Sequence, residues 1–129
     1  MSYALQMNGS VGSDPNGPSD AAALSSAINL NFQQTYDNVL PGGLTLNNAP
    51  PNQPFPILLG AMTAVRAIAI RAVDGQSLIV VVTSAAGASQ QLAVSDLLVI
   101  RAQNTADKYT AISIIGTGRV EWLIAGNNS

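Results

Sequence analysis

Residues 65–83, VRAIAIRAVDGQSLIVVVT, constrain the fold of this chain more than any other stretch. Two runs rich in β-branched residues flank Asp74-Gly75, and such runs favour strands. Asp-Gly tolerates the positive φ angles of a tight type I′ turn, so the stretch predicts a β-hairpin. The second run is apolar on both faces, because Leu78, Val80 and Val82 alternate with Ile79 and Val81.

From residue 57 onward, short β-rich runs alternate with turn signals at a spacing of roughly 8–12 residues, which is typical of sandwiches and barrels. The predicted fold class is therefore mainly β, with a compact antiparallel β-sandwich or jelly-roll-like body over residues 57–129. Its expected strands are 57–60, 65–73, 77–83, 91–94, 97–102, 109–115 and 120–125. The run 97–100 is also apolar on both faces. Gly116-Thr117-Gly118 is expected to be a hairpin turn.

Residues 1–56 are predicted to form an appendage in three parts. Residues 1–18 are rich in Ser, Asn, Gly and Pro, and cannot bury enough apolar surface to order alone, so they form an extended arm. A short helix over about 20–40 should end before Pro41-Gly42-Gly43. Four prolines between residues 50 and 56 make 44–56 a semi-rigid connector that cannot join the middle of a sheet. The apolar stripe of the helix, which can pack on its own sheet or on a neighbouring subunit, comprises Leu24, Ile28, Phe32 and Tyr36.

The composition indicates that the β body needs additional cover. Only 9% of the residues are charged and 47% are apolar, whereas an ordinary soluble domain carries about 25% charged residues. A block of about 70 residues buries only about 60% of its unfolded surface, and strands that are apolar on both faces must be covered on both. Other copies of the chain can provide this cover, or the predicted helix can. The interface candidates are Ile79, Val81 and Trp122, together with Leu24, Ile28, Phe32 and Tyr36.

Side chains that could carry out chemistry are scarce. The absence of Cys and His excludes a disulfide framework, a thiolate nucleophile, an imidazole base and a zinc-type cluster. The seven acidic residues show no spacing that would direct two of them at one substrate. We therefore predict that the protein is not an enzyme and has no catalytic residue, no cofactor and no metal site. A net charge of −2 and the lack of a long apolar run argue against nucleic-acid and membrane partners.

The polar arm, short helix, proline-rich connector and block of small Ala/Val/Ile/Gly-rich strands resemble the small virion structural proteins of tailed bacteriophages. The stretch AIAIRAVDGQSLIVVVT…LLVIRAQN…YTAISIIG…VEWLIAG is similar to their β-sandwich capsid-decoration and head- or tail-appendage modules. The resemblance implies a non-enzymatic virion component, often a homotrimer, that binds itself and a major capsid or other virion protein. It also implies a capsid decoration or cement protein that attaches to the shell through its N-terminal arm.

Two alternatives stay open. One is a tail, fibre or baseplate adaptor protein within the same virion class. The other is a glycan-binding β-sandwich module, which requires exposed aromatic side chains around a shallow site. The sequence offers few such side chains, because only Tyr109 and Trp122 among the aromatic residues lie in the β body.

Overall fold

The computed structural model describes residues 3–8, 10–13, 26–29, 32–47, 54–102 and 108–128, and every helix or strand element among them is a β-strand. All strand pairings are antiparallel, which confirms the predicted mainly β class. The strands are β1 (Tyr3–Met7), β2 (Ser10–Ser13), β3 (Ser26–Asn29), β4 (Phe32–Tyr36), β5 (Asn38–Leu46), β6 (Phe55–Pro56), β7 (Ala64–Ala72), β8 (Leu78–Ser84), β9 (Ser89–Val94), β10 (Leu97–Arg101), β11 (Tyr109–Ile115) and β12 (Gly118–Asn127).

The helix predicted over residues 20–40 is wrong. The described residues of this region form β3, β4 and β5, and none of them is helical. The apolar stripe was ambiguous, because a spacing of four residues is even and therefore also keeps side chains on one face of a strand. Leu24 lies outside the described residues.

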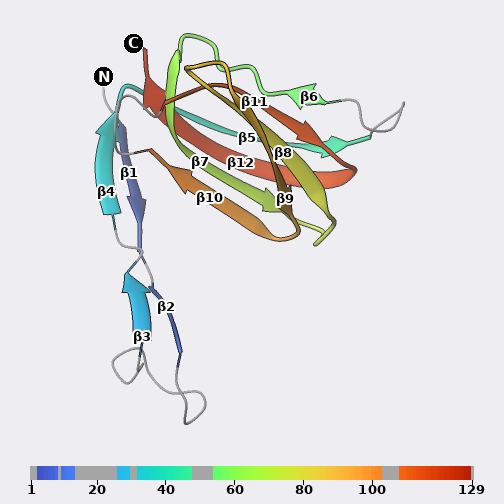
Figure 1. Ribbon diagram of the computed structural model, residues 1–129, viewed down its shortest axis with the longest axis horizontal. Coiled ribbons are helices and arrows are strands. Elements are labelled where there is room, and N and C mark those ends of the chain that lie inside the picture. Colours follow the sequence, from blue (N-terminus) through green and yellow to red (C-terminus); the bar gives the residue numbers. More distant parts are fainter. Residues whose placement is uncertain are drawn as a thin grey trace.

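The N-terminal segment forms a two-stranded antiparallel ribbon. β1 pairs with β4 from Tyr3↔Tyr36 to Met7↔Phe32, and β2 pairs with β3 from Ser10↔Asn29 to Ser13↔Ser26. Figure 1 shows the β1–β4 half beside the body and the β2–β3 half projecting away from it. The described residues of the predicted polar arm, 3–8 and 10–13, therefore include two strands that each pair with a second strand.

The other strands form two layers around one core. Layer A has the order β10-β7-β12-β5, layer B has the order β9-β8-β11-β6, and one pairing, Tyr109↔Val65, joins them into a single folded sheet. Side chains of both layers meet in one apolar cluster, which gives a sandwich-like arrangement (Figure 1). The cluster includes Ile68, Ile70, Val120 and Ile124 from layer A and Val80, Val82, Ile112 and Ile114 from layer B.

The hairpin predicted at Asp74-Gly75 is wrong, because β7 pairs with β12, β10 and β11 whereas β8 pairs with β11 and β9. The segment between β7 and β8 crosses from layer A to layer B. Gly75 has the expected positive φ, 69°, and its N–H donates to the Ala72 carbonyl at 3.1 Å. Gly75 is thus the last residue of a turn that starts at Ala72, and this turn belongs to the interlayer crossing. The hairpin expected at Gly116-Thr117-Gly118 is wrong for the same reason, because β11 and β12 do not pair with each other.

Most strands of the body were predicted closely. The strand predicted at 109–115 is β11, and those at 77–83 and 97–102 match β8 and β10 within one residue at each end. The strand predicted at 57–60 is wrong, since the strand there is β6 (Phe55–Pro56), and Ile57 only donates one backbone hydrogen bond to the Ile112 carbonyl, at 2.9 Å.

β5 borders layer A and pairs with β12 from Asn38↔Gly126 to Leu46↔Gly118. Residues 38–46, which the sequence analysis placed in the appendage, are therefore a strand of the main sheet. Val73 N–H donates to the Arg119 carbonyl at 3.1 Å, so odd-numbered residues of β12 face β7 and even-numbered ones face β5. The partner of Trp122 is Gly42, which leaves Pro41 facing the outer edge, where its missing N–H interrupts no ladder.

Candidate assembly surfaces

The β1–β4 half of the ribbon, called its base below, packs on the outer face of layer A, and the β2–β3 half is the ribbon tip. Tyr36 of β4 is 1% exposed and contacts Ala67 of β7 and Ala125 of β12. Leu5 of β1 and Val39 of β5 pack against the same cluster. The two alanines leave room for an aromatic ring on the sheet. Tyr36, a predicted interface residue, is thus buried on its own sheet, which was one of the two alternatives for the stripe.

Polar contacts also hold the ribbon base on the body. The Arg101 Nη2 group of β10 donates to the Gln34 Oε1 atom of β4 at 3.0 Å. The Asp37 N–H donates to Asn127 Oδ1 at 3.1 Å, and the Asn128 N–H donates to Asp37 Oδ2 at 3.2 Å. The base is therefore fixed both to β10 and to the end of β12.

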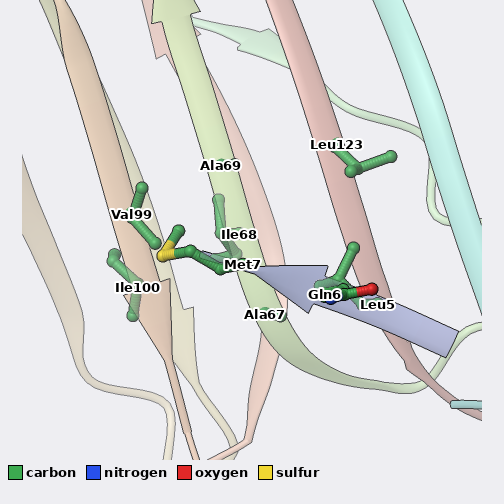
Figure 2. A pocket seen from close by; sticks show the side chains of 9 residues that line it. All are labelled: Leu5, Gln6, Met7, Ala67, Ile68, Ala69, Val99, Ile100 and Leu123. Atoms are coloured by element: carbon green, nitrogen blue, oxygen red, sulfur yellow. The ribbon is translucent and has the colours of Figure 1, made fainter. Parts of the chain in front are cut away.

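An apolar cavity of about 70 Å³ lies between β1 and layer A. In Figure 2, the Met7 side chain points toward Val99 and Ile100 of β10, and Leu123 of β12 lies at the opposite end of the pocket. The volume is well below the roughly 300–1,000 Å³ of ligand sites. It is a packing gap beneath the ribbon and too small for a substrate.

The outer face of layer B brings together two of the predicted interface residues, Ile79 and Val81 of β8. Ile79 is 36% exposed and Val81 is partly exposed, while the alternate residues Leu78, Val80 and Val82 are buried. Strands β8, β9 and β11 contain no charged residue. By strand register, the outer face of layer B comprises Ile79, Val81 and Thr83 of β8, Ser89, Gln91 and Ala93 of β9, and Ala111, Ser113 and Ile115 of β11.

Trp122 lies on the opposite layer and does not join Ile79 and Val81. It is half-buried against the core. A Cβ atom added to Gly42 on β5 would lie 2.5 Å from the indole Cε2 atom, so glycine leaves the room that the ring occupies. The indole N–H has no hydrogen-bond partner within the described part of the chain. Of the other predicted interface residues, Ile28 and Phe32 are opposite Val11 and Met7 in the ribbon.

A wider groove, of about 430 Å³, lies between the segment after β6 and the first half of β11. Its lining runs from Pro56 to Gly60 and also includes Met62, Thr63 and residues 110–113, without a charged side chain. Leu58, one of the lining residues, is 82% exposed. Such a groove can receive an apolar side chain, but it contains no group for acid–base chemistry.

Sequence reasoning missed the most exposed apolar residues, Leu58 and Leu97, as interface candidates. Leu58 follows no strand periodicity, so no pattern marked it. Leu97 belongs to the run 97–100 that is apolar on both faces, and this signal could have identified it. Leu97 is 60% exposed and Val99 is 40% exposed.

Within the described residues, no group of three or more Asp, Glu, His or Cys could hold a metal ion. None of these residues forms a helix that could cross a membrane. No protein-family model, curated protein or solved structure matches this chain.

Proposed function

We propose that the protein is a non-enzymatic structural component of a virion, a homo-oligomeric capsid decoration protein that attaches to the shell through its N-terminal ribbon. The observation that carries this proposal is the projecting β2–β3 half of the ribbon (Figure 1). Among the described strands, β2 and β3 pair only with each other, so each presents an outer edge. An extended segment with such edges is suited to adding to a neighbouring protein by strand pairing.

The outer face of layer B supports self-association of a sandwich or jelly-roll-like body. It is uncharged and carries exposed Ile79 beside Val81. Depletion of charged residues is the compositional sign of an interface core. The resemblance to phage decoration proteins suggests three copies about one axis, with the major capsid protein as the second partner.

The groove that Leu58 lines supports the binding of an apolar side chain, and its lining has no titratable side chain that could act as an acid or a base. A glycan-binding role is less supported, because Tyr109 and Trp122 are both half-buried and Phe55 of β6, which is 39% exposed, provides only a single ring.

Co-sedimentation with purified capsids and, separately, purified tails of the same phage tests the proposal. The matched variant replaces residues 10–29 by Asn-Gly, which removes β2 and β3 and keeps β1, β4 and the contacts of Tyr36. We expect the full chain to sediment with capsids and the shortened variant to bind at least about tenfold more weakly at an unchanged melting temperature. Equal binding by the variant, or no binding to either particle, would refute the proposal. Binding to tails alone would favour the adaptor function.

A further inference from the structure

β10 (Leu97–Arg101) borders layer A and pairs only with β7 among the described strands (Figure 1). It is firmly held there at its end, because the buried Arg66 Nε group donates to the Ala102 carbonyl at 3.1 Å. The Ala102 N–H in turn donates to the Arg66 carbonyl at 2.7 Å. β10 is thus a fixed edge of the sheet.

The hydrogen bonds at both ends show which way the β10 backbone faces. At the start, the Ala72 N–H donates to the Asp96 carbonyl at 2.8 Å, in the same register as the Ala102–Arg66 pair at the other end. Hydrogen-bonded and non-hydrogen-bonded pairs alternate along an antiparallel ladder. Even-numbered residues of β10 therefore bond to β7, and Leu97, Val99 and Arg101 turn their N–H and C=O groups toward the outer edge.

This edge lacks the protection that other edges of the body have. Proteins block exposed edges with proline, charged residues or very short strands. β5 presents Pro41 at its outer edge, β6 is two residues long and includes Pro56, and the outward residues of β9 are polar or small. β10 reads LLVIR, without proline or an acidic residue. Of its three residues that face the edge, Leu97 and Val99 expose apolar side chains, and Arg101 at the end of the strand is partly buried and donates to Gln34 of the ribbon.

The edge of β10 is complementary to itself. If β10 strands of two copies pair antiparallel about a two-fold axis at Val99, the two Val99 residues lie opposite each other. Each Val99 N–H then donates to the Val99 carbonyl of the other copy. The same register places Leu98 opposite Ile100 of the second copy on the other face. The Val99 pair and the two Leu98–Ile100 pairs are apolar, Leu97 lies opposite Arg101, and no like charges lie directly opposite each other. We propose that this edge is a self-association site, at which β10 of a second copy pairs antiparallel about Val99.

The contact is small, because five residues of edge on each copy fall well short of the roughly 20–30 residues a side of a stable interface. It should therefore be weak in dilute solution and should form where copies are held close together, as neighbours on one particle are. This last step rests on the proposed function, but the pairing itself does not. It uses neither the ribbon tip nor the outer face of layer B.

Disulfide trapping tests the register, because the chain has no cysteine of its own. In Val99→Cys the two cysteines would face each other, with Cα atoms about 5.5 Å apart, which suits a disulfide. In Leu97→Cys they would be about 13 Å apart, four residues along the strands. We expect Val99→Cys to form a linked dimer at least about tenfold faster than Leu97→Cys and the control Leu58→Cys, although both control sites are more exposed. Equal or faster linking at either control site would overturn the proposal.

Sedimentation equilibrium of the cysteine-free protein provides a second test that does not depend on the folding of Val99→Cys. Leu97→Pro removes a donor that faces the edge and leaves the β7 ladder intact. Both proteins carry Ile79→Asp, which removes the association proposed for layer B, so that a change in mass reports on β10 alone. We expect Ile79→Asp alone to double its monomer mass as its concentration rises toward about 1 mM, and the variant that also carries Leu97→Pro not to do so at an unchanged melting temperature. Absence of this step with Ile79→Asp alone, or its persistence when Leu97→Pro is added, would overturn the pairing. Capsid binding by Leu97→Pro is scored separately, so failure of the pairing and failure of the proposed function are distinguishable.

Discussion

Replacing Tyr36 by alanine tests whether the ribbon is held on the body by the contact that the structure shows. The ring is 1% exposed and packs on Ala67 and Ala125 of layer A. An aromatic side chain buries about 150–250 Å², and at about 25 cal/mol/Å² this burial contributes roughly 4–6 kcal/mol at most. Extended-chain areas overstate burial, and the alanine Cβ remains, so we expect a loss of about 3 kcal/mol.

The loss should fall on the docking of the ribbon, because Tyr36 belongs to a separate apolar cluster from the core between the layers. A loss of about 3 kcal/mol corresponds to a roughly 100-fold larger population of undocked ribbon. We therefore expect hydrogen exchange of the backbone amides in β1 and β4 to become about 100-fold faster, while amides of β8 in the core change much less.

Tyr36→Phe is the matched control for this experiment. It keeps the ring and removes only the hydroxyl group, which donates to Gln34 Oε1 at 3.3 Å. Loss of one such hydrogen bond costs about 1 kcal/mol or less, so exchange in β1 and β4 should change only a few-fold. If Tyr36→Ala left β1 and β4 as protected as in the wild type, the ring would not be what holds the ribbon, and this reasoning would fail.

Two further substitutions test the layers. Ile79→Asp should leave the protein folded and abolish oligomers in sedimentation velocity, with a melting temperature lowered only by the loss of association. Val80→Asp, one residue away in the core, should prevent folding because it buries an unpaired charge. If the Ile79→Asp protein stayed oligomeric, the outer face of layer B would not be the surface through which the copies associate. Gly42→Ala should destabilise the protein by about 1–3 kcal/mol in urea unfolding, because its Cβ would meet the Trp122 ring. Gly43→Ala should cost less, since the closest atom there belongs to the flexible end of Arg119.

The strands of the body could be predicted because their alternation is local. β11 carries buried Ile112 and Ile114 at a period of two, and its bounds follow from the residues themselves. Pairing partners could not be predicted in the same way. The positive φ of Gly75 suits a hairpin and equally suits a crossing between layers, and only the packing of distant strands decides between them.

The candidate assembly surfaces, too, could be predicted only where a local pattern decides them. Ile79 and Val81 were identifiable as apolar, yet the sequence could not say whether they or Leu78, Val80 and Val82 face the core, because both sets are apolar. The ribbon was missed because Tyr36 lies four residues after Phe32, a spacing that helix and strand share. The residues of β10 that face the outer edge are those that do not bond to β7. The register between the two strands decides which these are, and composition does not show it.

The structure shows how part of the apolar surface of these strands is covered. Strands that are apolar on both faces need cover on both, and the two layers cover each other's inner faces through one shared core. The outer face of layer A is partly covered by the ribbon, through Tyr36 on Ala67 and Ala125. The ribbon thus takes the covering role that the sequence analysis gave to a helix. Among the described residues nothing equivalent covers Ile79 on layer B or Leu97 at the β10 edge. These two surfaces proposed for assembly are therefore apolar surfaces that no other described part of the chain covers.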